Sequence, residues 1–341
     1  DWSCLTLDSS GDVGQYNSIA IDPTTNLPQI AYYDASEEAL KLASINGVWG
    51  STTIVGTIFG SIGKFASLKI DSTGAQHIAY YYEYNQYMSL RYARYVGGGG
   101  NCGGGNYQCD IIDSGDRVGQ YASLALDGSG QPRIAYYDGG NGDLWYAEPG
   151  TIGNCGPGGT WGCRLVSSAS DVGQYASLDV DNGNIPHIAY YDATNGKLMY
   201  AVYVVGGGNC GFVGSWQCDE ITKTGSLPIA RPVSLAVDKA GFPIIAYVDN
   251  YWTGIGMRRF GRARPAAALG LQGGNCDLNN AWQCEGIDGP WTGAYSAIAV
   301  NPSGLATIAC NYSEFVFDPS ELRLAYQRYY QFYLPIVMKN P

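Results

Sequence analysis

Carboxylate, carboxamide and phenol side chains recur at fixed places along this chain of 341 residues. The run IAYYD occurs three times and ends in an aspartate, and a Gln-Tyr pair precedes each copy. Carboxylates beside tyrosines could bind sugar hydroxyls or calcium, and a pair of carboxylates could cleave a glycosidic bond. The candidate binding residues are Asp34, Asp138, Asp192, Gln15, Gln120, Gln174, Tyr16, Tyr121 and Tyr175.

These aspartates also have a simpler interpretation, because Asp often caps a turn by accepting hydrogen bonds from nearby backbone amides. Their repetition favours capping, since a catalytic residue usually breaks a repeat. Calcium is the one ion that such a set could hold, and no other cofactor is indicated.

Other catalytic or metal chemistry is not indicated. His77 and His187 precede IAYY runs in separate units, so they do not converge on a metal or in a triad. No G-x-S-x-G, H-E-x-x-H or P-loop motif occurs. We therefore predict that the chain is not an enzyme and has no metal site.

A repeat must position the candidate residues. Six segments align with QYASLALD, and they close at residues 22, 71, 127, 181, 238 and 301. Each continues into IAYYD or a variant, then a polar turn, then a run such as LRYA, and most end in an aromatic-x-Cys segment. Each unit therefore predicts four short strands without helical periodicity, which is typical of a β-propeller blade.

The predicted fold is all-β, a six-bladed β-propeller of four-stranded antiparallel blades in one domain over residues 1–327. The blades are expected near 12–56, 61–113, 117–168, 171–223, 228–288 and 292–327. The last unit lacks an aromatic-x-Cys segment, whereas DWSCLTLD at 1–8 matches WGCRLVS at 161–167. We expect residues 1–8 to close the last blade, because an open sheet edge leaves backbone groups unpaired.

Ten cysteines are present, and eight fall in close pairs across Gly-rich loops, which suits disulfides better than zinc. The predicted bonds are Cys102–Cys109, Cys155–Cys163, Cys210–Cys218 and Cys276–Cys284. Cys4 and Cys310 remain. They could be free thiols, a strained internal bond, or a bond made by a displaced N-terminal segment within or between copies. Disulfides indicate an oxidising compartment, so we expect a secreted or cell-surface protein.

The apolar, aromatic tail at 328–341 could pack on the propeller's flank or act as a strand at a sheet edge, its own or a neighbour's. In the second case residues 1–8 would be displaced and could complete a neighbouring molecule, which builds a polymer. The residues expected to take part in assembly are Cys4, Cys310, Phe332, Tyr333, Leu334 and Ile336.

The net charge of −11 disfavours nucleic acids and anionic membranes, because both attract Lys and Arg. No run approaches the roughly 20 apolar residues that span a bilayer. The chain starts at Asp1 without an apolar leader, so we expect that any export signal has been removed.

The consensus VGQYASLALD, then IAYYD, then LKYA, present from Val13 to Ala201, resembles repeats of secreted bacterial proteins with sialidase-like propellers. This resemblance implies the architecture. Sialidases also carry S-x-D-x-G-x-x-W boxes, three strand-borne arginines and a Tyr/Glu pair, and no such box is present here. The resemblance therefore does not imply their activity.

These features lead us to expect a secreted, non-catalytic structural or adhesive module that self-associates, as a fibre or surface layer, through its terminal strands. One alternative is a glycan-binding lectin that uses the Asp, Gln and Tyr residues. A second alternative is a glycoside hydrolase of sialidase-like type.

Overall fold

The computed structural model describes residues 5–46, 48–56, 60–150, 153–221, 230–251, 257–265, 281–286, 296–300, 306–312 and 321–326. These residues are all-β, as predicted, apart from two short 3-10 turns, η1 (Gly103–Gly105) and η2 (Phe212–Gly214). Within these ranges no helix has the length and apolar character needed to cross a bilayer.

Consecutive strands pair side by side and antiparallel, so each sheet is a meander. The first sheet comprises β1 (Val13–Ile21), β2 (Pro28–Asp34), β3 (Ala39–Asn46) and β4 (Val48–Val55). The second comprises β5 (Ser61–Ile70), β6 (Gln76–Tyr84), β7 (Tyr87–Tyr95) and β8 (Tyr107–Gly115). The third comprises β9 (Val118–Leu126), β10 (Pro132–Asp138), β11 (Asp143–Pro149) and β12 (Trp161–Ser167).

The remaining sheets repeat this order along the chain. The fourth comprises β13 (Val172–Val180), β14 (Pro186–Asp192), β15 (Lys197–Tyr203) and β16 (Trp216–Glu220). The fifth comprises β17 (Ala230–Val237), β18 (Pro243–Tyr251), β19 (Met257–Pro265) and β20 (Trp282–Gly286). The last has three strands among the described residues, β21 (Ser296–Val300), β22 (Ala306–Tyr312) and β23 (Glu321–Tyr326).

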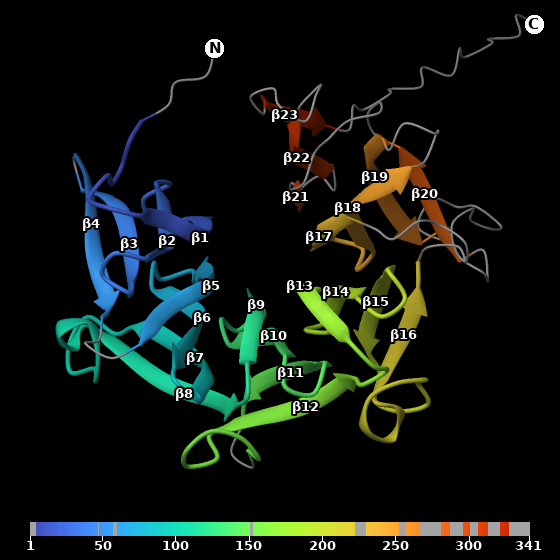
Figure 1. Ribbon diagram of the computed structural model, residues 1–341, viewed down its shortest axis with the longest axis horizontal. Coiled ribbons are helices and arrows are strands. Elements are labelled where there is room, and N and C mark those ends of the chain that lie inside the picture. Colours follow the sequence, from blue (N-terminus) through green and yellow to red (C-terminus); the bar gives the residue numbers. More distant parts are fainter. Residues whose placement is uncertain are drawn as a thin grey trace, which may run out of the picture.

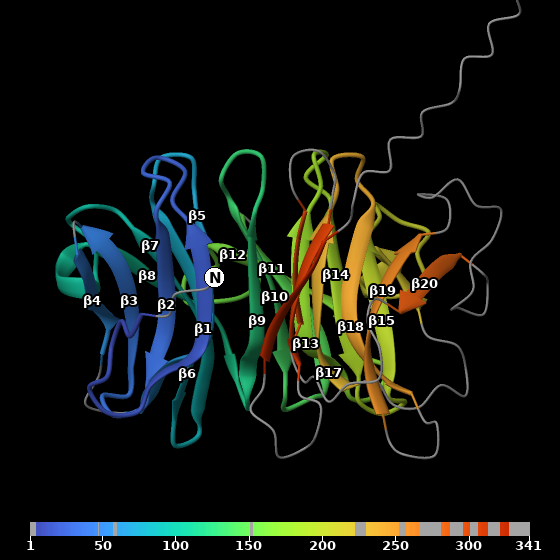
Figure 2. The same ribbon diagram turned by 90° about the horizontal axis from the view of Figure 1, so that it is seen from above.

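The sheets follow one another around a common centre (Figure 1). The first strand of each sheet, β1, β5, β9, β13, β17 or β21, lies toward the middle, and the fourth strands lie outside. In the view turned by 90°, the sheets stand side by side, and their strands run along the axis through the common centre (Figure 2). This arrangement of four-stranded antiparallel sheets is compatible with a β-propeller.

The hydrophobic core lies between neighbouring sheets. One cluster joins Leu90 and Tyr92 of the second sheet to Leu124 and Tyr136 of the third. Because both faces of a sheet are covered, a second strand such as β14 (PHIAYYD) is buried along its whole length. This burial explains why IAYYD is an apolar run and does not alternate with polar residues.

A close backbone contact joins the first strands β5, β9 and β13 to the sheet before each of them. Gly63 has a φ of +113°, and a Cβ there would lie 2.8 Å from the Cα of Leu40. Gly119 is in the same situation, with a φ of +102° and a Cβ that would lie 2.7 Å from the Cα of Leu90. Only glycine allows both this backbone conformation and this approach.

Serine hydroxyls form a second link between successive sheets. The backbone N–H of Leu68 donates to the Ser18 Oγ of the first sheet at 3.0 Å. The same bond recurs from Leu124 to Ser67, Leu178 to Ser123, Leu235 to Ser177 and Ile298 to Ser234, at 2.9, 2.9, 2.9 and 3.1 Å. In these five sheets, the bond fixes the position of the first strand along its length relative to the first strand of the preceding sheet.

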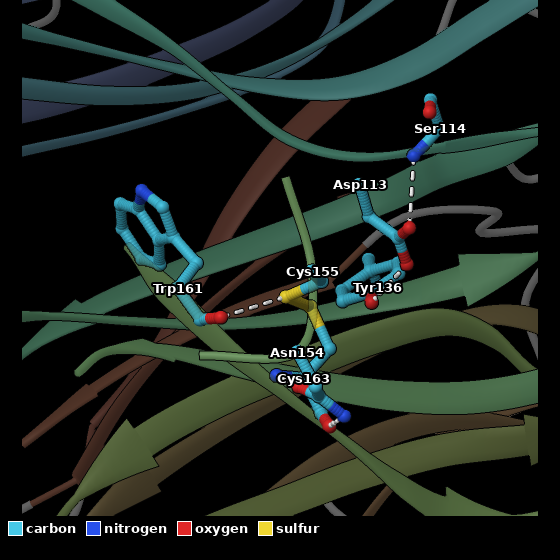
Figure 3. Close-up of a disulfide and its surroundings, with 7 residues drawn as sticks. All are labelled: Asp113, Ser114, Tyr136, Asn154, Cys155, Trp161 and Cys163. Atoms are coloured by element: carbon cyan, nitrogen blue, oxygen red, sulfur yellow. Dashed lines mark hydrogen bonds between the residues drawn. A yellow bond between two sulfur atoms is a disulfide. The ribbon is translucent and has the colours of Figure 1, made fainter. Parts of the chain in front are cut away.

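Three predicted disulfides are confirmed, Cys102–Cys109, Cys155–Cys163 and Cys210–Cys218, with Cα atoms 5.9, 5.8 and 5.9 Å apart. An asparagine holds the loop at each bond. Asn154 accepts from the Cys163 N–H at 2.7 Å and donates to the Cys163 carbonyl at 3.0 Å (Figure 3). Cys284 is disulfide-bonded, and its predicted partner Cys276 lies outside the described residues.

The predicted closing strand, residues 1–8, stays a prediction, because residues 1–4 lie outside the described ranges. Residues 5–8 have no strand conformation, and β23 has no fourth-strand neighbour among the described residues. Instead, the Tyr32 hydroxyl donates to Asp8 Oδ2 at 2.6 Å, so the segment lies against the first sheet. The hydrogen bond from Tyr32 therefore holds Asp8 in place, although none of the described strands pairs with residues 5–8.

We expect Ser123→Ala to lower the free energy of unfolding by about 1–2 kcal/mol, because the half-buried N–H of Leu178 loses its acceptor. Urea denaturation measures the change. Ser72→Ala, in an exposed turn, is the matched control and should change stability by less than about 0.5 kcal/mol. Equal effects of the two substitutions would contradict a role for the serine link.

Two histidines predict acid sensitivity. His77 is buried between the Tyr92 hydroxyl and Asp71 Oδ2, at 2.5 and 3.2 Å, and burial lowers its pKa below 6.5 despite Asp71. The unfolded chain therefore binds a proton that the folded chain does not, so stability is lost as pH falls through about 6.5.

We expect the free energy of unfolding of the native chain to fall by up to about 1.4 kcal/mol per pH unit for each such histidine between about pH 6.5 and 5. His187, also buried, contributes in the same direction. The slope should be smaller in His77→Gln, and comparing the two chains cancels the titration of carboxylates. An unchanged slope would show that His77 does not titrate differently on folding.

Candidate functional site

The predicted aspartates are buried in turns. Asp138 Oδ1 accepts from the N–H groups of Gly140 and Asn141 at 3.0 and 3.3 Å, and Oδ2 accepts from Asn141 Nδ2 at 2.7 Å. Asp192 makes the equivalent bonds with Asn195 at 2.9 and 2.8 Å. These contacts are those of turn caps, the alternative that the repetition favoured.

Asp34 caps its turn in the same way and also forms an ion pair. Its Oδ1 accepts from the N–H groups of Ser36 and Glu37, both at 2.9 Å. Its Oδ2 lies 2.6 Å from Lys41 Nζ, and its side chain is fully buried. Hydrogen bonds to the carboxylate lower the pKa of Asp34, led by the one from Lys41, and they outweigh burial, which acts oppositely.

The predicted glutamines lie on the first strands of three sheets. Gln15 donates to Asp12 Oδ2 at 2.9 Å, and Gln174 donates to both oxygens of Asp171 at 3.1 Å. Gln120 takes the equivalent place on β9, opposite Tyr137 of β10. Two of these amides are thus oriented by a neighbouring carboxylate, and their carbonyl oxygens keep acceptor capacity.

Aromatic side chains from four successive sheets stand next to one another. They are Tyr16, Phe65, Tyr121 and Tyr175, which we call the aromatic arc. Along the arc, neighbouring ring centroids lie 4.7, 4.8 and 4.4 Å apart. The arc brings together all three predicted tyrosines and adds Phe65. The sequence analysis missed Phe65 because KFASLKID has Lys-Phe in place of Gln-Tyr.

All four arc residues have a left-handed backbone, with φ of 51°, 53°, 51° and 55° in chain order. This conformation is rare for bulky residues and costs on the order of 1–3 kcal/mol each. A bulge imposes it, because two residues of the first strand, such as Tyr121 and Ala122, face one residue of the second. A bulge re-aims its side chains.

The arc lines a cavity of about 210 Å³. Ala66, Ala122 and Ala176 also line the cavity, together with Asn17 of the first sheet and Val233 of the fifth. The small alanine side chains leave the aromatic rings as the main surface of this cavity. The site therefore offers flat apolar ring faces and the phenol groups of its tyrosines. A glutamine amide precedes each of these tyrosines in the chain.

A second cavity, of about 330 Å³, lies between the second and third sheets. We call it the acidic pocket, and its lining includes Asp113, Asp116, Asp138, Asn141 and Trp145. Among the described residues, its Trp145 indole N–H is buried without a hydrogen-bond partner.

Asp113 is the half-buried carboxyl of this pocket. Its Oδ2 accepts from the Tyr136 hydroxyl at 2.6 Å and its Oδ1 from the Ser114 N–H at 2.8 Å (Figure 3). Burial raises the pKa of Asp113, and the charge of Asp138 adds to the effect. Asp116, by contrast, is 70% exposed.

The position that Trp145 holds in the acidic pocket varies along the repeat. Trp145 occupies the place that Lys41 has in the first sheet, where the ammonium pairs with the capping aspartate. The third sheet therefore has the aspartate without the lysine. The fourth sheet also lacks the lysine, with Met199 at this place, so the indole of Trp145 was the signal in the sequence that could have identified the pocket.

Several predicted residues fall outside the description. Cys4 and the tail residues Phe332, Tyr333, Leu334 and Ile336 lie outside the described ranges. Cys310 is on β22, but nothing is described of its side chain, so the Cys4–Cys310 bond stays a prediction. Within the described ranges, no group of three or more His, Cys, Asp or Glu side chains could hold a metal ion.

No protein-family model matches the sequence, and no curated protein matches it. A protein of unknown function from Dyadobacter fermentans DSM 18053 has a similar structure, with a TM-score of 0.56, 11% identity, and coverage of 93% of this chain and 95% of that one. At this identity the similarity shows a shared fold.

Two carbohydrate-active enzymes are also similar at the level of the fold. Polysaccharide lyase Uly1 has a TM-score of 0.47 and 10% identity, over 94% of this chain and 91% of that one. The endo-arabinase from Bacteroides thetaiotaomicron VPI-5482 has a TM-score of 0.43 and 9% identity, over 93% of this chain and 95% of that one.

These comparisons correct the prediction that the chain is not an enzyme, because enzymes occur among the similar structures. That prediction rested on missing motifs. A missing motif excludes no activity, because the same chemistry recurs on unrelated folds with other sequences. The expected structural or adhesive role has no support in the comparisons either.

Proposed function

We propose that this protein binds carbohydrate at the aromatic arc. The observation that carries the proposal is the row of four rings, with centroids 4.4–4.8 Å apart, lining one cavity. The C–H face of a sugar ring packs on an aromatic face, and phenol groups can bond its hydroxyls. Ligand sites in proteins commonly combine such apolar surfaces with a few polar groups.

The amides near the arc support binding of a polyhydroxylated ligand. Gln15 and Gln174 are held by Asp12 and Asp171, and the Tyr137 hydroxyl donates to Asp171 Oδ1 at 2.6 Å. Preorganised polar groups lose little entropy when a ligand binds. The disulfides fit a protein that works in an oxidising compartment outside the cytoplasm, where free glycans are encountered.

We expect Tyr121→Ala to weaken binding to an oligosaccharide identified on a glycan array by about fivefold, since a ring contact contributes on the order of 1 kcal/mol. Tyr121→Phe should retain most of the affinity, because it keeps the ring. Isothermal titration calorimetry measures both. Tyr87→Ala is the control, because Tyr87, at the start of β7, is 75% exposed and does not line the cavity. Equal losses in Tyr121→Ala and Tyr87→Ala would reject the arc as the site.

A second candidate function is cleavage of a glycosidic bond in the acidic pocket. Two carboxyls in different environments suit this chemistry, a half-buried Asp113 with a raised pKa and an exposed Asp116. Asp113 would give its proton to the glycosidic oxygen as the C1–O bond breaks. Asp116 would take a proton from the water whose oxygen forms the new bond to C1.

We expect Asp113→Asn to lower the release of reducing ends from oligosaccharides at least about 100-fold, the usual size of a general-acid effect. Native oligosaccharides are the proper substrates, because activated leaving groups need no acid. Asp110→Asn, on the same strand but outside the pocket lining, should keep its activity. No turnover by the native chain on a broad oligosaccharide panel would reject this candidate and leave arc binding to its own test.

A further inference from the structure

A tyrosine beside the aromatic arc has a hydroxyl without an acceptor. The ring centroid of Tyr81 lies 5.9 Å from that of Phe65, which belongs to the arc. Tyr81 is 1% exposed, and among the described residues no group forms a hydrogen bond with its hydroxyl. A buried polar group usually has a partner, so an acceptor is missing at this place.

The third sheet shows what the acceptor would be. Tyr137 is the second tyrosine of its IAYYD run, as Tyr81 is the second tyrosine of IAYYY in the second sheet. The Tyr137 hydroxyl donates to Asp171 Oδ1 at 2.6 Å, and Gln174 Nε2 donates to the same oxygen at 3.1 Å. One carboxylate of the following sheet therefore accepts from a phenol and an amide together.

Arg117 is the counterpart of Asp171 in the sheet that follows Tyr81. The Ala193 N–H donates to the Asp171 carbonyl at 2.8 Å in the fourth sheet. The Gly139 N–H donates to the Arg117 carbonyl at 3.1 Å in the third. Because these backbone bonds are equivalent, the chain has a cation where the repeat elsewhere has the accepting carboxylate.

Two donors lie near the Tyr81 hydroxyl. Burial raises the pKa of Tyr81 to about 12, and the Gln120 amide and the Arg117 charge oppose this effect, so both groups are close to the hydroxyl oxygen. A Cβ on Gly139 would lie 2.9 Å from Arg117 Cβ and 3.0 Å from Gln120 Oε1, so both side chains pack around this glycine. A phenol, an amide and a guanidinium therefore gather without a carboxylate among them.

The nearby carboxylates leave Arg117 available to a ligand. Arg117 Nε lies 3.7 Å from Asp116 Oδ1, and the two side chains are 54% and 70% exposed, so water screens this long contact. Glu83, another carboxylate near Tyr81, is paired with Lys64 at 3.0 Å. A guanidinium at the surface can bind a carboxylate through two parallel hydrogen bonds.

We propose that Arg117, Gln120 and Tyr81 bind a carboxylate that the ligand supplies. This carboxylate accepts from the Tyr81 hydroxyl and the Gln120 amide, as Asp171 does from their counterparts in the next sheets. The inference rests on the proposed function, because the arc holds the sugar ring. Gln120 directly precedes Tyr121 of the arc, so a carboxylate attached to that sugar ring is within reach. The ligand class is therefore an oligosaccharide of uronic acids.

Matched pairs of glycans test the ligand class. Oligomers of galacturonate, glucuronate and mannuronate are compared on an array with the same oligomers after reduction of each carboxyl group to an alcohol. We expect at least one uronate oligomer to bind at least about tenfold more tightly than its reduced form, because hydrogen bonds to a charged group are the stronger ones. Titration calorimetry measures the two affinities.

The outcomes separate this inference from the proposed function. If the reduced oligomers bind as well as the uronates in every pair, the carboxylate site is overturned and sugar binding at the arc stands. Sulfated galactan oligomers that bind more tightly than every uronate would assign the site to a sulfate ester and overturn the choice of a carboxylate. Binding of none of these glycans would count against the proposed function and the inference together.

Substitutions then locate the site. With the preferred uronate oligomer, Arg117→Ala should weaken binding at least about tenfold and Tyr81→Phe about fivefold, and each should leave binding of the reduced form within about twofold. Tyr81→Phe loses no hydrogen bond of the folded chain, so its stability should not fall. Arg117→Asp supplies the missing carboxylate within the chain and should abolish the preference for the uronate. Arg94→Ala removes an exposed arginine of β7 and is the control. Equal losses in Arg117→Ala and Arg94→Ala, or an unchanged preference in Arg117→Asp, would overturn the inference.

Discussion

The backbones of the first strands β5, β9 and β13 touch the sheet before each of them, and this contact shapes the centre of the molecule. Gly119 fits against Leu90 only because it has no Cβ and adopts a positive φ. The Ser67 hydroxyl then fixes the height of the next strand through the Leu124 N–H. The bulge that follows the glycine turns Tyr121 out of the regular strand pattern. The packing between sheets and the orientation of the arc's rings therefore both depend on the same short segment at the start of the first strand.

The two candidate sites relate to the repeat in opposite ways. The aromatic arc uses the repeat, because equivalent positions in four sheets bring their rings together around one cavity. The acidic pocket uses a position at which the repeat varies, because Trp145 stands where the first sheet has Lys41 and the fourth has Met199. A repeated surface suits binding of a ligand with several similar faces. A departure suits chemistry that needs a single set of groups.

Much of the fold could be predicted from the sequence, because strands, turns and loop disulfides are recorded within one unit. IAYYD predicted a buried strand, and the aspartates predicted turn caps, as Asp138 shows. Contacts between units leave no such pattern, so neither the Tyr136–Asp113 bond nor the place of Phe65 in the arc was foreseen. The left-handed φ of Tyr121 is equally invisible, since its cause is a bulge in the pairing of β9 with β10.

The central claim is that the aromatic arc is a carbohydrate-binding surface. Saturation-transfer NMR with selective irradiation of the aromatic protons tests it most directly, using an oligosaccharide that the protein binds. We predict strong transfer to the C–H protons of one sugar face, and its loss when Tyr121 and Tyr175 are replaced by alanine. Transfer that survives this double replacement unchanged would contradict the account.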